Sequence, residues 1–497
     1  MSGDKEPRKL WGHQTDAVAR AKELGNFGLF FEPGAGKTGT CIHMLRDKYN
    51  KNRGLLKTIV LCPPIVIENW KHEFNLNSKI PSDSITCLFG TGKQRRAIFL
   101  ERSVKPHIFI TNYETLQMEV FEDMLKWGVE AVVFDECHRL ANYTSKRSKA
   151  AEKLVNGKMH YDKKTNTYSG PRPFVYILSG SPILNSPMDI FQQYKILDAG
   201  GTFGANFFGF RARYFRDKNA GMPKQSYFPN WVPIAGALEE IGDKLNRNSM
   251  RVLKKDCMDL PPLIRQVIPV EMAPAQRKLY ESMLEDYVAY FTKDGKEEVT
   301  SATMGMTKSL RLMQIASGYI KTVDGEELDI CDKYNPKQEA LYELLEDLTP
   351  NHKVIVWAVW IQNYEQIRRV LRDLKLDWLE INGSNGAEKN RENAKEFEEN
   401  NKVRVLIAHP ESGGEGINLV SASYAITYSR TYSLRQDIQA EARNYRGGSG
   451  IHEKITRIDL VSKDTVDEKI LEALANKQEV GEKILREITL QLTKKGK

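Results

Sequence analysis

NFGLFFEPGAGKTGT, residues 26–40, is the stretch that decides how this 497-residue sequence folds. Its first half is a run of apolar and aromatic residues with the length of a strand. Its second half contains GAGKT (34–38), which is how a phosphate-binding loop ends, although Phe31 stands where the full G-x-x-x-x-G-K-[ST] pattern has its first glycine. A helical segment, TGTCIHMLRDKY, follows directly. The order strand, glycine turn, helix favours a phosphate site over a chance Gly-Lys-Thr.

Each residue of this loop has an expected task. Glycines let the backbone approach an anion closely, and a helix N-terminus presents free N–H groups to it. We therefore expect Gly34, Ala35 and Gly36 to surround phosphate oxygens. Lys37 is expected to reach the β- and γ-phosphates, and the Thr38 hydroxyl to bind Mg²⁺. The stretch thus predicts a nucleotide site.

A second half-motif lies at AVVFDECH, residues 131–138. Four apolar residues predict a strand, and Asp135 and Glu136 stand where that strand leaves the sheet. We expect Asp135 to hold Mg²⁺ through water and Glu136 to polarise the water that attacks the nucleotide. Two solvated acids at a strand end are common, but their occurrence together with the Gly-Lys-Thr loop favours a working nucleotide site.

Composition and charge set broad limits. The chain is 41% apolar and 28% charged with a formal net charge of +8, which permits a polyanionic partner without demanding one. We expect no membrane segment, because no stretch approaches the roughly 18 apolar residues of a span, and the charged start lacks a signal-peptide core. The six cysteines are scattered without a C-x-x-C pair, which favours a soluble protein of a reducing, intracellular setting.

Short apolar runs alternate with helical stretches in two parts of the chain, which predicts an α/β fold with parallel sheets. The runs expected to form strands are 26–33, 57–64, 107–113, 131–136, 174–180, 353–360, 378–383, 403–410, 424–429 and 455–462. Between the two sets, segments such as 274–291 and 307–320 have helical composition. We therefore expect an N-terminal lobe over 1–200, a mainly helical region over 201–335 and a C-terminal lobe over 336–497.

DECH following GxGKT resembles the superfamily-two helicases, and in detail the compact bacterial or phage members of the Swi/Snf-type translocases. The resemblance runs over most of the chain, with the motifs in the family's order. The segments that carry it are GHQ (12–14), IVLCPPIVIENWKHEF (59–74), LSGSPILNSPMDIF (178–191), SGGEGINL (412–419), QAEARNYRGG (439–448) and DTVDEKIL (464–471). Ala442 departs from the aspartate that is usual in the sixth motif.

The resemblance implies two RecA-like lobes that bind ATP with Mg²⁺ between them. It implies that Gln14 recognises adenine and that Arg443 and Arg446 stabilise the charge that develops on the γ-phosphate. It also implies motif coupling through four residues: His138, Ser179, Gly416 and Gln439. Nucleic-acid contacts are expected, on weaker grounds, at Lys71, Asn112, Ser181, Asn185, Ser412, Asn418 and Arg435.

The function that follows is ATP-driven movement along nucleic acid, with double-stranded or branched DNA as the first choice. Replication, recombination or repair, including branch migration and fork remodelling, are the expected processes, and proteins of those processes are candidate partners of a monomeric motor. A phage gene product would act in the host cytoplasm. An RNA or single-stranded DNA helicase is the alternative, and a scaffold with a degenerate cleft is a third. The aromatic-basic stretch 206–217 could stack bases, but its spacing favours packing.

Overall fold

A computed structural model describes residues 9–165, 167–222, 228–257, 259–293, 309–321, 327–331, 333–412 and 417–494. The contacts divide the chain into two units. Unit 1 comprises Met1–Arg216, Trp231–Met258 and Lys477–Lys497, and unit 2 comprises Asp217–Asn230 and Asp259–Asn476. Residues 201–335, which we expected to form a helical region of their own, are therefore divided between the two units.

Unit 1 is built on a seven-stranded sheet in the order β11-β1-β8-β5-β2-β4-β3. All of its recorded strand pairs are parallel. The strands are β1 (Phe27–Phe31), β2 (Thr58–Leu61), β3 (Ile85–Cys87), β4 (Ile108–Thr111), β5 (Ala131–Asp135), β8 (Phe174–Leu178) and β11 (Ser249–Val252). Because parallel strands end at one edge of a sheet, the residues that follow β1, β8 and β5 are neighbours in space.

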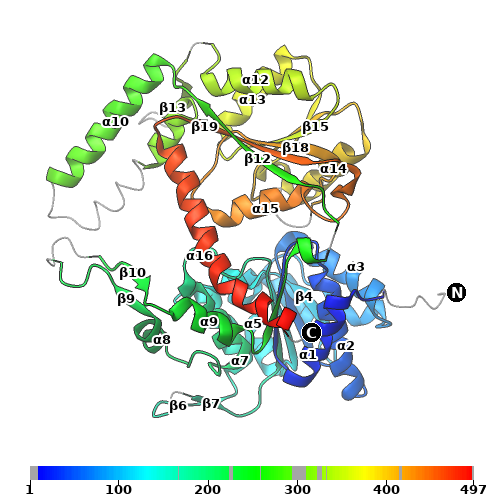
Figure 1. Cartoon of the computed structure of the whole chain (residues 1–497). Helices are drawn as coiled ribbons and strands as arrows, with labels where there is room; N and C mark the ends of the chain where they lie inside the picture. The colour runs from blue at the N-terminus through cyan, green and yellow to red at the C-terminus, as the bar shows by residue number, and fades with distance from the viewer. Residues whose placement is uncertain are drawn as a thin grey trace. The chain divides into compact units, whose positions relative to one another are not determined.

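Helices cover both faces of this sheet (Figure 1). They are α1 (Gly12–Leu24), α2 (Lys37–Lys51), α3 (Ile67–Asn77), α4 (Gly92–Arg102), α5 (Val120–Trp127), α6 (Lys146–Asn156), α7 (Ile190–Asp198), α8 (Phe207–Tyr214) and α9 (Ala237–Leu245). Side chains of β1 alternate between two cores: Leu29 packs with α1, α2 and α3, whereas Phe30 packs with the cluster that includes α5, α7 and α9. The sheet is buried on both faces, as parallel sheets are.

Unit 2 is built on a six-stranded sheet in the order β12-β19-β18-β15-β17-β16, again with parallel pairs. The strands are β12 (Leu263–Val270), β15 (Lys353–Trp357), β16 (Trp378–Ile381), β17 (Val405–Ala408), β18 (Ala422–Thr427) and β19 (Ile455–Ser462). The ten strands predicted from the sequence are therefore all present, whereas β3, β11 and β12 were not predicted.

Two pairs of helices lie on opposite faces of the second sheet (Figure 1). The pairs are α12 (Pro336–Leu348) with α13 (Ile361–Asp373), and α14 (Gly386–Glu399) with α15 (Leu434–Asn444). The unit also includes α10 (Pro274–Lys293), a helical segment at 309–316 and the start of α16 (Val466–Lys494). No helix in the described ranges has the length and apolar character that a membrane crossing requires.

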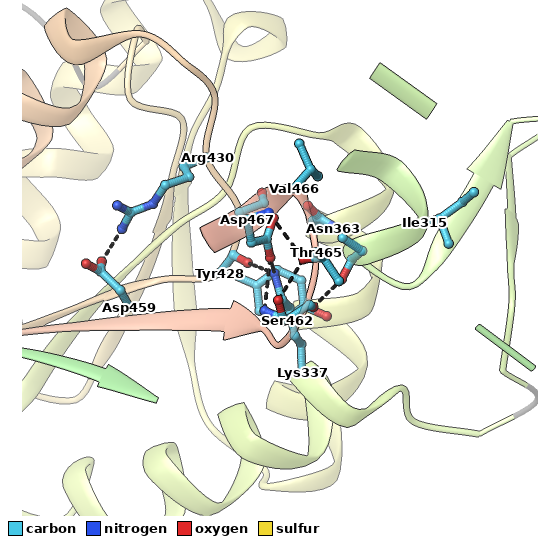
Figure 2. Close-up of polar contacts among 12 residues, drawn as sticks. Ile315, Lys337, Asn363, Tyr428, Arg430, Asp459, Ser462, Thr465, Val466 and Asp467 are labelled. Carbon is cyan, nitrogen blue, oxygen red and sulfur yellow. Dashed lines mark hydrogen bonds and ion pairs between the residues drawn. The ribbon is translucent and has the colours of Figure 1, made fainter. Parts of the chain in front are cut away.

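A buried ion pair joins the first turns of α12 and α16 (Figure 2). Lys337 Nζ lies 2.6 Å from Asp467 Oδ2, and the two side chains are 3% and 10% exposed. Lys337 also donates to Tyr428 O at 3.3 Å, and the backbone N–H of Ser462 donates to Asp467 Oδ2 at 3.1 Å. Thr465 Oγ accepts from the N–H of Asp467 at 3.2 Å. The start of the DTVDEKIL segment is thereby fixed to the second sheet.

A second ionic cluster holds α15 against β19. Arg457 on β19 pairs with Asp437 on α15 and lies 3.3 Å from Asp459 Oδ1. Its Nη1 also lies 3.4 Å from Glu441 Oε2. Arg430, which follows β18, pairs with Asp459 and lies 3.7 Å from Asp437 Oδ1. The helix that carries Arg443, and after which Arg446 lies, is thus attached to its sheet through buried charges.

Burial alone would oppose the charges of this cluster, so the neighbouring opposite charges decide their state. Burial lowers the pKa of Arg457, but Asp437 and Asp459 outweigh it and the pKa is raised overall. Burial raises the pKa of Asp459, but Arg457 and Arg430 outweigh it and the pKa falls below the ordinary value. Asp459 therefore stabilises the fold above the pKa of an unfolded aspartate, and that contribution is lost as the pH falls through its lower folded value.

We expect Asp459→Asn to destabilise unit 2 by up to about 3 to 5 kcal/mol, because the buried Arg430 and Arg457 lose the carboxylate that they share. Hydrogen–deuterium exchange of peptides from β19 and α15 measures the change. Glu392→Gln is the control, because Glu392 pairs with Lys389 at the surface. We expect this control to change the free energy of unfolding by less than about 1 kcal/mol. In the wild type, protection of these peptides relative to the intrinsic exchange rate should fall as the pH falls below about 4, and a variant that matches the wild type would contradict the stabilising role.

Candidate nucleotide site

The phosphate loop leaves β1 and enters α2 through two glycines in the left-handed region. Gly34 has φ 97° and Gly36 has φ 80°. The positive φ favours glycine at position 36, and a Cβ there would lie 2.1 Å from Gln14 Nε2 and displace that side chain. Lys37 begins α2 and donates from Nζ to Phe31 O at 2.8 Å, so its chain bends back over the loop. Phe31 is fully buried in the strand, as the sequence predicted.

The first helix contacts this loop from the side. Gln14 Nε2 donates to Gly36 O at 3.3 Å, and Gln14 Oε1 accepts from the N–H of Trp11 at 2.8 Å. His13 Nε2 lies 3.0 Å from Ala35 O. Gln14 therefore supports the loop backbone, a role that the sequence analysis did not foresee, and its recognition of adenine stays a prediction.

Asp135 ends β5 and is held by three donors. Trp70 Nε1 donates to Asp135 Oδ2 at 2.8 Å, and the N–H of Glu136 donates to Oδ1 at 3.0 Å. Tyr113 Oη donates to the backbone carbonyl of Asp135 at 2.6 Å. Trp70 is 1% exposed and Asp135 is 8% exposed. The carboxylate is thus fixed by a buried indole from α3, which orients it as outer partners orient metal ligands.

Glu136 follows with a backbone φ of 53°, a left-handed value that is costly for a residue with a side chain. Glu136 Oε2 lies 3.2 Å from His138 Nδ1 and 3.5 Å from Ser179 Oγ. His138 Nδ1 and Ser179 Oγ are 3.1 Å apart. The structure thus brings together Glu136, His138 and Ser179, all of them residues that the sequence analysis predicted to belong to the site.

The loop after β8 is joined to the same region by buried contacts. The Cys137 thiol donates to Gln193 Oε1 at 2.9 Å, and Gln193 Nε2 donates to Pro182 O at 2.7 Å. Burial raises the pKa of Cys137 well above its ordinary value, so the thiol stays a neutral donor. A Cβ on Gly180 would lie 2.9 Å from Pro33 Cδ. The segments after β1, β5 and β8 therefore form one packed block.

The residues at this edge fit a phosphate group with Mg²⁺. Left-handed glycines and the first turn of α2 are a backbone arrangement suited to an anion. Within the described ranges no group of three or more His, Cys, Asp or Glu could hold a metal ion. Mg²⁺ takes one or two protein carboxylates and completes its shell with water and substrate phosphate. Asp135 and the half-buried Thr38 are the residues that could bind it.

Unit 2 carries the predicted arginines on and after α15. Arg443 is 6% exposed; its Nη1 donates to Ile417 O at 3.2 Å, and its carbonyl accepts from the N–H of Leu419 at 3.1 Å. Arg443 therefore attaches α15 to the end of the SGGEGINL segment. Arg446 is half-buried, and burial lowers its pKa. Gln439 is buried on α15, whereas Gly416 lies outside the described residues.

The residues predicted to contact nucleic acid differ in exposure. Asn112 is buried, where its Oδ1 accepts from Arg95 at 2.6 Å and from Thr115 at 3.0 Å. This placement gives Asn112 a structural task instead of a free surface. Asn185 and Asn418 are exposed. The half-buried members are Lys71, Ser181, Ser412 and Arg435. For all of them the contact with nucleic acid stays a prediction.

Two functional contacts were missed by sequence reasoning. Trp70 was noted only as part of a motif, and nothing in its position along the chain signals that it reaches Asp135. Gln193 lies in α7 without any motif, yet it joins Cys137 to the loop after β8. Both contacts link residues that are far apart in sequence, which periodicity cannot detect.

Comparisons with known proteins agree with this arrangement. A family model described as the SNF2-related domain matches residues 18–317, and one described as the helicase conserved C-terminal domain matches residues 336–448. An uncharacterized ATP-dependent helicase of Mycoplasma genitalium is 26% identical over 475 residues, which are 94% of this chain and 41% of that protein. The chain spans less than half of the length of the two Mycoplasma helicases that it matches, 41% and 43%.

A phage protein and a solved structure are also similar. Putative protein p41 of Acyrthosiphon pisum secondary endosymbiont phage 1 is 24% identical over 463 residues, which cover 91% of this chain and 92% of that protein. The structure titled "Sulfolobus solfataricus SWI2/SNF2 ATPase core in complex with dsDNA" is 21% identical, with a TM-score of 0.41, and the match covers 98% of this chain and 94% of that chain.

The first family model alone covers more than half of the chain. The predicted family is thereby confirmed, and the two parallel sheets flanked by helices confirm the predicted α/β class. The chain belongs to the SNF2-related family, and a helicase conserved C-terminal domain follows the SNF2-related domain.

Proposed function

We propose that this chain is an ATP-dependent DNA translocase that turns over ATP at the edge of the unit 1 sheet. One observation carries the proposal. Three adjacent parallel strands, β1, β8 and β5, end at one edge with the phosphate loop, Ser179 and the Asp135-Glu136 pair. The name "ATP-dependent helicase" of the Mycoplasma relative supports the same chemistry.

Each residue of this edge has a task in the proposed reaction. Lys37 and the loop N–H groups hold the phosphates, and Thr38 and Asp135 hold Mg²⁺, which when bound neutralises phosphate charge. Glu136 orients and polarises the attacking water. Its carboxylate is kept in place by His138 Nδ1 at 3.2 Å and Ser179 Oγ at 3.5 Å, so little reorganisation is needed during reaction.

Arg443 and Arg446 are proposed to complete the reaction from unit 2. A guanidinium placed at the γ-phosphate is worth roughly 10³ to 10⁵ in rate for arginine fingers. Arg443 already bonds to Ile417 O, whereas Arg446 is the less buried of the two and is our candidate for phosphate contact. If the arginine has to approach unit 1, hydrolysis is coupled to movement of the two units.

We propose duplex or branched DNA as the track, because the sequence resembles the Swi/Snf-type translocases. Replication, recombination or repair would be the setting, with branch migration or fork remodelling as the activity. Such movement depends mainly on phosphate contacts and is sensitive to salt. The alternative is an RNA or single-stranded DNA helicase, and no sequence feature tests it.

The proposal is tested by ATP turnover measured with duplex DNA, single-stranded DNA and RNA as stimulants. We expect the strongest stimulation by duplex DNA, and we expect ATP-driven displacement of a triplex strand without efficient unwinding of a fork. Lys37→Ala should abolish both activities, since the loop loses its phosphate contact. Strongest stimulation by RNA would replace the proposed track, and undiminished activity of Lys37→Ala would refute the assigned nucleotide site.

We expect Glu136→Gln to bind ATP but to hydrolyse it about a hundredfold more slowly or worse, because an amide cannot polarise the water. Binding is measured with a fluorescent ATP analogue and hydrolysis by phosphate release. Glu122→Gln is a matched control in the same unit, since Glu122 forms only an exposed pair with Lys153. Normal hydrolysis by Glu136→Gln would remove the assigned role.

We expect Trp70→Phe to raise the Mg²⁺ concentration for half-maximal ATP turnover by about tenfold, because Asp135 loses its buried donor while the ring remains. Mg²⁺-dependent binding of a fluorescent ADP analogue should shift in parallel, which gives a readout independent of turnover. Trp127→Phe removes an indole donor to Ser103 O at 2.7 Å elsewhere in unit 1 and should leave the Mg²⁺ dependence unchanged. A lower rate without a shifted Mg²⁺ dependence would assign Trp70 to packing alone.

A further inference from the structure

Aromatic rings and an arginine gather on one side of α8, in unit 1. Tyr143 stacks on Phe207 with ring centroids 3.9 Å apart and an angle of 19°. Phe208 meets Phe207 edge-on at 5.9 Å. The Arg211 guanidinium lies 4.0 Å from the centroid of Trp231 and 5.2 Å from that of Phe208. We call these five residues the ring patch.

Packing of the core accounts for only part of the ring patch: Phe207 and Trp231 lie against the large core cluster, whereas Phe208 does not belong to it. On the other side of α8, Phe210 and Tyr214 are buried and join Phe203 in the large core cluster, which fits the packing role that the sequence spacing favoured. Phe208 by contrast is 58% exposed, and Arg211 is half-buried. The helix is therefore held by one face, while the other presents an aromatic ring with a cation beside it.

The charge around the ring patch favours a polyanion. Residues 143–149 contain three basic side chains and no acid, and residues 206–216 also contain three basic side chains and no acid. Arg147 is paired with Glu114 at 3.0 Å and Arg213 with Glu240 at 2.8 Å, whereas Arg216 is exposed. Exposed rings among basic residues are the combination that binds single-stranded nucleic acid, because every base offers a face for stacking and every phosphate a negative charge.

The position of Tyr143 connects the ring patch with the nucleotide site. Tyr143 lies between the short helix η4 (Cys137–Leu140), which directly follows Glu136, and α6. Its ring is stacked on Phe207, so a ligand on the ring patch would rest against the segment that carries Glu136. This placement would let an occupied ring patch influence hydrolysis.

We propose that the ring patch binds an unpaired stretch of DNA, with a base stacked on Phe208 and the backbone held by Arg211 and its basic neighbours. The proposal rests on the proposed function in one respect, namely that nucleic acid is the ligand. It deepens that function, because a translocase with such a site would engage the unpaired strand of a branched or forked substrate as well as the duplex track.

The test is fluorescence anisotropy, without nucleotide, on a labelled oligothymidine and on a blunt duplex of equal length. We expect Phe208→Ala to weaken single-strand binding about tenfold and to change duplex binding less than about twofold. Phe208→Trp should preserve single-strand affinity, because stacking needs a ring of any kind. Arg211→Gln should weaken single-strand binding and reduce its dependence on salt.

Phe174→Ala is the matched control. Phe174 is 37% exposed and has Lys48 Nζ 5.0 Å from its ring centroid, but it begins β8 at the sheet edge opposite the nucleotide site. Its removal should leave both affinities unchanged. The thermal unfolding midpoint, which we expect to be the same in Phe208→Ala and in the wild type, reports that this variant is folded.

Two results would overturn the ring patch as a binding site. Unchanged single-strand affinity in Phe208→Ala would indicate that the exposed rings bind a protein partner instead of single-stranded DNA. An equal loss on single strand and duplex would indicate a backbone contact without base stacking. If the wild type itself binds no DNA, the proposed function fails with its ligand, whereas DNA binding by the wild type with an unaffected Phe208→Ala overturns the ring patch alone.

Discussion

The register of β1, β8 and β5 is the constraint on which the candidate site depends. Leu29 is opposite Leu178, and Leu178 is opposite Asp135, so the three strands end together. A parallel sheet allows this only if both of its faces are covered, which α1 to α3 and the helices of the opposite core provide. Burying the strands therefore brings the phosphate loop, Ser179 and Asp135 to one edge before any chemistry is considered.

Buried polar contacts then fix the orientation of segments that packing of the hydrophobic cores alone does not determine. Asp135 accepts a hydrogen bond from the indole N–H of Trp70, and Arg457 forms ion pairs with carboxylates on α15 and β19. Such contacts contribute little net free energy, since burial of the polar groups offsets much of their attraction, but loss of one partner is costly. Their effect is geometric: each holds one functional segment, β5 or α15, in a single orientation.

The sequence was enough to predict the strands whose side chains are nearly all apolar. It did not predict strands in which polar side chains are buried. β11 reads SMRV, and its buried Arg251 donates from Nη2 to both carboxylate oxygens of Glu482 at 2.7 Å. β12 is largely exposed and mixed in polarity, so it has no hydrophobic run to detect. Motif residues were placed by resemblance, but the neighbours that orient them were not, because Trp70 and Gln193 act through contacts distant in sequence.

The block around Glu136 explains how binding elsewhere on unit 1 could reach the site. Glu136 is held in a left-handed conformation, Cys137 is tied through Gln193 to the loop after β8, and Tyr143 is stacked on Phe207. A close-packed segment transmits a displacement instead of absorbing it. A shift of the Tyr143 ring would therefore change the orientation of the segment that begins at Glu136, where the distances to His138 and Ser179 are already at hydrogen-bonding range. The strained backbone at Glu136 is the point at which such a shift would be converted into a change of hydrolysis rate.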